Sequence, residues 1–140
     1  MKRQPLLPLP SGAQLSASSP EVLGCFDRPE VSAVLLFGSQ AAGGAHALSD
    51  VDLAYLGTNF AAEDAAFDAI LEALQRTLGE GRFDLVPLRR APLHLRFQIL
   101  TEGKVLAAKD RGMLEDVTTD TIVRYLDFKP YRDAYFAGSD

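Results

Sequence analysis

Two apolar runs, separated by a loop of small residues, are the feature of this sequence that most constrains its fold. The first run, Val31–Phe37, is apolar on both faces apart from one serine. Such a run is typical of a central strand covered on both sides, although a buried helical segment fits as well. Gly38 and Ser39 follow it, and the second run begins with two carboxylates, Asp50 and Asp52. The pattern predicts a strand, a phosphate-holding turn, a short helix or loop, and a second strand with acidic residues at its start.

The turn after the first run has the chemistry of a phosphate site. Gly38 lets a ligand approach the backbone closely because it has no side chain. Ser39 offers a hydroxyl and a backbone N–H, and the free N–H groups of a helix beginning here would favour a phosphate. A Gly-Ser pair alone is also typical of a polar loop, so this interpretation depends on the acidic residues further along the chain.

The acidic residues predict a metal site. Asp50 and Asp52 are two positions apart, so on a strand both side chains point to the same face. Their repulsion is relieved by a divalent cation, and carboxylate oxygens are the ligands that Mg²⁺ prefers. Asp84 interrupts a third apolar run, Arg82–Leu88, where an unpaired acid is costly. Taken alone, Asp-x-Asp fits a solvated strand end and Asp84 fits an ion pair; taken together, they are candidate metal ligands.

The rest of the chain alternates between helical and extended patterns. Apolar residues recur at helical spacing over Phe60–Leu78, and Pro92–Glu102 also reads as a helix. A short strand is expected near residues 102–106, and a helix over Met113–Phe136 that Pro130 should kink or restart. A short helix is expected within Ser16–Phe26, followed by a turn that leads into the first strand.

Composition limits the classes of protein that fit. A chain of 140 residues predicts one domain, which we assign to residues 13–140, after a Pro-rich tail at residues 1–12. The net charge is −5 and no basic patch is present, which argues against nucleic acid as a direct partner. Cys25 is the only cysteine, so no intrachain disulfide forms. No apolar run is long enough for a signal peptide or a membrane span, so we expect a cytoplasmic protein without membrane contact.

The combined motif resembles a known superfamily. Gly38-Ser39-x-Ala41 with Gly43, followed by Ser49-Asp50-Val51-Asp52-Leu53, is similar to the nucleotidyltransferases that include DNA polymerase β. Within that superfamily the chain resembles the minimal nucleotidyltransferase (MNT) antitoxins of HEPN/MNT toxin–antitoxin pairs. The family pattern has Arg where this chain has Ala42. The resemblance implies an α/β (α+β) fold with a small mixed sheet of about four strands flanked by helices.

The family's activity gives the expected function. An MNT antitoxin transfers AMP from ATP to a tyrosine hydroxyl of its cognate HEPN toxin, an RNase, and so neutralises it. The resemblance implies that the metal-binding and catalytic residues, which hold Mg²⁺, are Asp50, Asp52 and Asp84. It implies that the nucleotide-binding residues are Gly38, Ser39 and Ser49. The expected partners are ATP and the toxin, the latter in a hetero-oligomer.

Two other functions remain open from the sequence. One is transfer of a nucleotide to a small molecule, as in aminoglycoside-modifying relatives, which usually carry an additional helical domain. The other is an antitoxin that blocks its partner by contact alone, an alternative that Ala42 keeps open. Three clustered acids argue against the second alternative, because a decayed site has no physical reason to keep them.

Overall fold

A four-stranded mixed sheet forms the centre of the protein. The computed structural model describes residues 18–38 and 51–137. The strand order is β3-β2-β1-β4, with β1 antiparallel to both neighbours and β2 parallel to β3. The strands are β1 (Val31–Phe37), β2 (Val51–Gly57), β3 (Phe83–Pro87) and β4 (Lys104–Ala108). The two most apolar runs are therefore the two central strands, as their lack of a polar face predicts.

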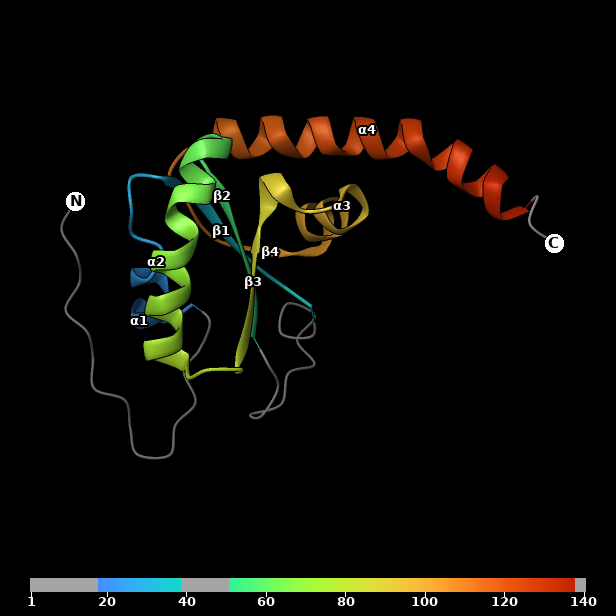
Figure 1. Ribbon diagram of the computed structural model, residues 1–140. Helices are drawn as coiled ribbons and strands as arrows, with labels where there is room; N and C mark the ends of the chain where they lie inside the picture. Colours follow the sequence, from blue (N-terminus) through green and yellow to red (C-terminus); the bar gives the residue numbers. More distant parts are fainter. Residues whose placement is uncertain (1–17, 39–50, 138–140) are drawn as a thin grey trace.

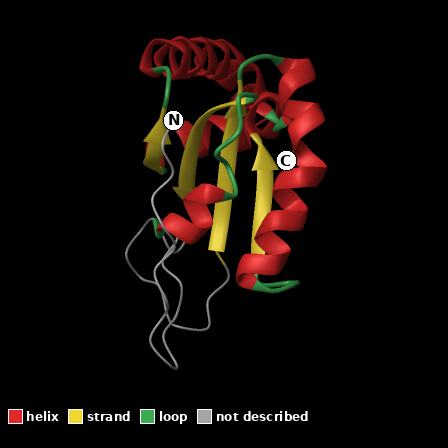
Figure 2. Ribbon diagram, turned by 90° about the vertical axis from the view of Figure 1, so that its left-hand side faces the viewer, coloured by secondary structure: helices red, strands yellow, loops and turns green. Residues whose placement is uncertain are grey.

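Helices cover both faces of this sheet (Figure 1). The helices are α1 (Pro20–Gly24), α2 (Phe60–Leu78), η1 (a 3₁₀ turn, Leu88–Arg90), α3 (Leu93–Glu102) and α4 (Arg111–Ala137). One core lies between the sheet and α1 and α2, and a second lies on the face that α3 and α4 cover. Figure 2 views the sheet from the side of α1 and α2. None of the helices in the described ranges is both long and apolar enough to cross a lipid bilayer.

The local signals of the sequence mark most element ends. The Ser19 hydroxyl accepts a hydrogen bond from the Val22 N–H and caps α1, and the Asn59 side chain caps α2 in the same way. The bounds of β1 and α2 are those expected. The third strand is shorter than predicted, because Leu88 begins η1, and Pro92 is the N-cap of α3 rather than part of its first turn.

The last helix differs more from the expectation. α4 begins at Arg111, where the Asp110 carboxylate accepts a hydrogen bond from the Met113 N–H. Pro130 does not restart it: the helix is uninterrupted, and its axis turns over the last part (Figure 1). It packs on α3 as far as Tyr125, whose ring stacks on that of Phe97 with centroids 3.9 Å apart. The last part of α4 extends beyond the sheet and α3 (Figure 1).

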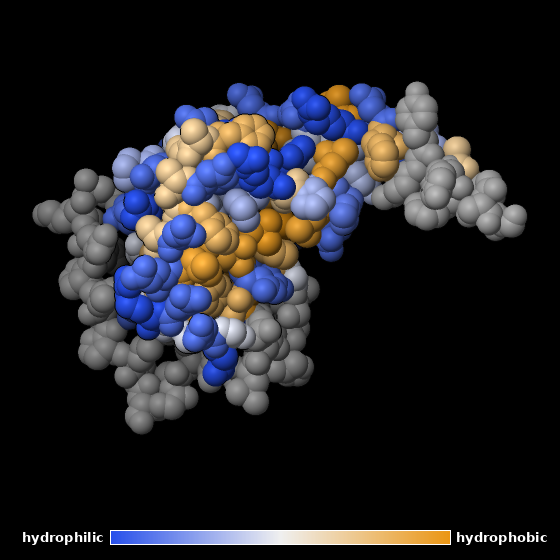
Figure 3. Space-filling model, viewed as in Figure 1, coloured by the Kyte–Doolittle hydropathy of each residue, from blue (hydrophilic) through white to orange (hydrophobic). Residues whose placement is uncertain are grey.

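Near the point where α4 passes beyond α3, apolar side chains on both sides of Tyr125 are exposed. Val123, Leu126 and Phe128 are each about half exposed, at 52%, 55% and 50%. Figure 3 shows apolar side chains among the charged ones along this helix. Apolar side chains of this size on a helix that extends beyond its own domain are typical of a surface that contacts another protein.

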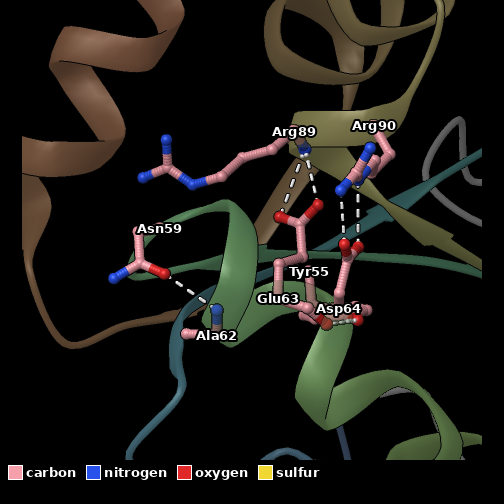
Figure 4. A network of polar contacts seen from close by, with 7 residues as sticks. All are labelled: Tyr55, Asn59, Ala62, Glu63, Asp64, Arg89 and Arg90. Carbon is pink, nitrogen blue, oxygen red and sulfur yellow. Dashed lines mark hydrogen bonds and ion pairs between the residues drawn. The ribbon is translucent and has the colours of Figure 1, made fainter.

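A buried glutamate joins β2, α2 and η1 (Figure 4). Glu63 is fully buried, and its carboxylate accepts hydrogen bonds from the Gly57 N–H at 2.9 Å and the Arg89 N–H at 2.9 Å. The Tyr55 hydroxyl donates to the Glu63 carbonyl at 2.6 Å, and the Arg89 guanidinium donates to the Gly57 carbonyl. The sequence analysis missed this anchor, although helical spacing places Glu63 in line with Ala66, Ile70 and Leu74 on the buried face of α2.

Burial of Glu63 has a consequence for stability against pH. Burial raises the pKa of the Glu63 carboxyl, and the backbone N–H groups that bind it only partly offset this. Between the unfolded value of about 4.3 and the higher folded value, the native state holds the proton more tightly than the unfolded chain. The carboxyl therefore contributes most stability at low pH, and this contribution is lost as pH rises through that window. The Glu63→Gln variant has no carboxyl group at this position, so its stability lacks this pH-dependent contribution.

The measurement is urea denaturation of the wild type and of Glu63→Gln from about pH 4 to about pH 8. The difference in free energy of unfolding, wild type minus variant, should fall as pH rises and then become constant. The other carboxyl groups titrate in both proteins, so their effect on stability cancels in this difference. A difference that rises with pH would contradict the raised pKa.

Candidate functional site

The pairing of β2 with β3 brings two predicted site residues together. The strands are parallel, and Asp52 is in register with Asp84. Paired residues of neighbouring strands point to the same face, and the strands of a sheet lie about 4.8 Å apart. The two carboxylates are therefore neighbours, although the whole of α2 separates them in the sequence. Carboxylate oxygens in such a pair suit a hard divalent cation.

Gly38 belongs to the same end of the sheet. Phe37, the last residue of β1, is in register with Asp52, and Gly38 follows it with a φ of 77°. A Cβ added at Gly38 would overlap the Asp52 carboxylate. The sequence suggested that this glycine leaves room for a ligand. The structure adds another reason for glycine here, which is that it leaves room for Asp52.

The acids face the layer that holds α3 and α4, since the alternating residues Leu53 and Tyr55 point into the other core. Asp84 is exposed and Asp52 is partly exposed, so solvent reaches this end of the sheet. The remaining predicted site residues, Ser39, Ser49 and Asp50, lie outside the described residues. Within the described ranges, no group of three or more acidic, His or Cys side chains could hold a metal ion. Of the three predicted ligands, the structure describes Asp52 and Asp84, which are in register on neighbouring strands.

Replacing Gly38 by Ala tests this close approach. The left-handed backbone conformation costs a non-glycine residue about 1–2 kcal/mol, and the added methyl displaces the Asp52 carboxylate. We expect a loss of free energy of unfolding of at least that size, measured by urea denaturation. Gly81→Ala is the matched control: it has the same φ of 77°, but its added Cβ meets nothing within 4 Å. Equal losses for both variants would show that the Asp52 contact adds nothing.

The chain belongs to the polymerase β-like nucleotidyltransferase family. Residues 25–112 match the family model described as "Polymerase beta, Nucleotidyltransferase", and this range is more than half of the chain. It contains every residue predicted for the site. No curated protein sequence matches the chain closely.

Solved structures narrow the similarity to MNT antitoxins, as the sequence motif indicated. A chain of a mutant toxin–antitoxin complex, MntA-HpeT, matches with a TM-score of 0.71 and 28% identity, over 89% of this chain and 98% of that chain. A chain of a toxin–antitoxin complex crystallised with AMP-PNP matches with a TM-score of 0.65 and 27% identity, over 84% of this chain and 94% of that chain. A third match is a chain from the complex of the tri-AMPylated Shewanella oneidensis HEPN toxin with MNT antitoxin. Its TM-score is 0.55 and its identity is 26%, over 79% of this chain and 84% of that chain. These matches confirm the expected fold.

Proposed function

We propose that this protein is an antitoxin that transfers AMP from ATP to a tyrosine hydroxyl of a cognate HEPN toxin and thereby neutralises it. The observation that carries the proposal is the pairing of Asp52 with Asp84, on one face of the sheet beside Gly38. This pairing is the arrangement that a metal-dependent nucleotidyl transfer requires, since two carboxylates must share a cation. Similar chains occur in a complex with AMP-PNP and in a complex with an AMPylated toxin.

The roles of the residues follow from their chemistry. Asp50, Asp52 and Asp84 would hold Mg²⁺, which neutralises charge on the triphosphate when bound. Gly38, Ser39 and Ser49 would hold the phosphates through backbone N–H and hydroxyl groups. The tyrosine oxygen attacks the α-phosphorus while its proton passes to the Asp84 carboxylate. The new P–O bond replaces the bond to the bridging oxygen, and pyrophosphate leaves.

The described surface supports a protein substrate. Asp84 is exposed rather than enclosed, so a side chain on another protein can reach it. The part of α4 beyond α3 extends outward on the face of the sheet that the acids share, at the end of the sheet opposite to them (Figure 1), so a partner bound there would have to reach along this face. We further propose residues 13–140 as the catalytic domain after a tail at residues 1–12, and a cytoplasmic location, where ATP is available.

The experiment is the intact mass of the HEPN protein encoded beside this chain, after incubation with this protein, ATP and Mg²⁺. We expect a gain of one or more AMP units. The control is the double variant Asp50→Asn/Asp52→Asn, which should give no gain. A stable complex with unmodified toxin would instead favour the contact-only antitoxin and make Ala42 the next residue to test. Absence of both binding and modification would overturn the proposal.

A further inference from the structure

A cavity beside α1 lies close to the place where the described part of the chain begins. Its volume is about 540 Å³, and its walls come from α1 and the residues around it, from the first half of β1 and from the end of β4. Ser18, the first described residue, is one of the lining residues. The cavity touches β1 at the end where Val31 begins it, whereas Gly38 follows the other end. This cavity is therefore not part of the acidic site.

The walls of the cavity that remain open are apolar. Pro20 and Ala107 are exposed, and Leu23 and Ala108 are partly exposed, so another group can contact these side chains. Phe26 lies deeper in the lining and is buried. Covering apolar surface of this kind is favourable by about 25 cal/mol for each Å² removed from water. The cavity is thus suited to an occupant with apolar side chains.

The charged residues of the lining do not select an ion. Asp27 and Lys109 have opposite signs, the Lys109 ammonium donates to the Arg28 carbonyl at 2.7 Å, and Asp27 has an interaction of its own. The mostly apolar walls also provide few acceptors for N–H groups, and a buried N–H without an acceptor is costly. The best occupant is therefore a neutral, apolar group that brings few N–H groups into the cavity.

The chain itself contains a segment with these properties. Residues 5–10 read Pro-Leu-Leu-Pro-Leu-Pro, so all six side chains are apolar and three of the six residues have no N–H. Prolines also restrict the backbone before binding, which lowers the entropy lost on binding. Residues 11–17 connect this segment to Ser18, and seven residues can span about 25 Å, which is more than the width of such a cavity. The segment can therefore reach the cavity of its own chain.

We infer that residues 5–10 bind in this cavity, with their leucine side chains against Leu23 and Ala107. A segment joined to its site by a short linker has an effective concentration on the order of a millimolar, so a weak affinity is enough to keep it bound. The bound segment covers apolar surface that adjoins the edge strand β4, where contact with other chains is otherwise favoured. This inference is independent of the proposed transfer of AMP, because none of these residues belongs to the acidic pair or to the turn at Gly38.

Nuclear Overhauser effects between methyl groups of the full chain test the inference. We expect effects between the methyl groups of Leu6, Leu7 or Leu9 and those of Leu23 and Ala107. In a mixture of labelled and unlabelled chains, isotope-filtered spectra should show these effects only within one chain. Effects between chains would instead identify the segment of a second copy as the occupant, and they would overturn the inference, as would the absence of any such effect in the wild type.

A variant of the segment gives a second measurement. Leu6→Ser/Leu7→Ser/Leu9→Ser keeps the three prolines but removes the apolar side chains that cover the cavity. We expect the amide resonances of Leu23 and Ala107 to shift relative to the wild type. Identical resonances in the two proteins would show that the cavity does not hold this segment.

The matched control is Lys2→Ser/Arg3→Ser, which changes the same tail outside the apolar segment. It should leave the amide resonances around the cavity at their wild-type positions, and neither variant should shift those around Asp84 or alter AMP transfer. A peptide with the sequence of residues 5–10, added to the triple variant, should move the cavity resonances back toward the wild type, with a dissociation constant on the order of a millimolar. A peptide that leaves them unchanged would contradict binding at this cavity. Thermal unfolding confirms that each variant is folded.

Discussion

Replacing Asp84 by Asn should reduce the rate of AMP transfer to the toxin about a thousandfold, as should Asp52→Asn. Each change keeps the shape of the side chain but removes a negative charge from the pair that the parallel register of β2 and β3 creates. Asp84→Asn also removes the group that receives the proton. The measurement is the initial rate of AMP incorporation into purified toxin, followed by intact mass at saturating ATP and Mg²⁺.

The free energy of unfolding should change little or even increase in these variants, because removing one charge removes the repulsion between the two carboxylates. Glu80→Gln is the matched control: this exposed acid precedes β3 at the same end of the sheet but lies outside the strand pairing. We expect its rate to stay within about twofold of the wild type, since surface charges act weakly across solvent. Normal turnover in Asp84→Asn would exclude this residue from catalysis.

The second large effect is on stability. Glu63→Ala should lower the free energy of unfolding by about 3 kcal/mol, because it leaves the Gly57 and Arg89 N–H groups without their acceptor and opens a cavity. The Arg89 guanidinium also loses the buried carboxylate with which it interacts electrostatically. The measurement is the free energy of unfolding from urea denaturation near neutral pH.

Glu72→Ala is the control on the same helix. Glu72 forms an exposed ion pair with Arg76 one turn away, and such pairs contribute about 0.5 kcal/mol or less. The two variants delete the same side chain from α2, so their difference isolates burial and hydrogen bonding from helix propensity. Losses of similar size in both would show that the Glu63 network contributes no more than a surface pair.

Much of the fold could be predicted because it rests on local patterns. The apolar runs predicted β1 and α2 with their observed bounds, and α1 lies within the segment Ser16–Phe26 where a short helix was expected. The shorter β3 was missed because Leu88 is as apolar as a strand residue, while its burial is decided by the 3₁₀ turn that it begins. The exposure of the apolar residues of α4 could not be predicted, because helical spacing cannot tell a core from a surface that another molecule covers.

The candidate site could be predicted in part for the same reason. Asp52 and Asp84 were selected from sequence, but only the parallel register explains why residues on different strands meet. The role of Gly38 beside Asp52, the Glu63 anchor and the cavity beside α1 depend on contacts between segments far apart in the chain. No spacing in the sequence encodes such contacts.

The parallel pairing of β2 and β3 also has a consequence during synthesis. A parallel pair needs a crossover, which here is the whole of α2, so the acids cannot meet until β3 has left the ribosome and docked. A partly synthesised chain therefore has Asp52 but no paired site, and under the proposed function it would not transfer AMP. Loss of β3 by local unfolding would have the same result in the finished protein. The proposed activity would thus report that the β2-α2-β3 unit has assembled.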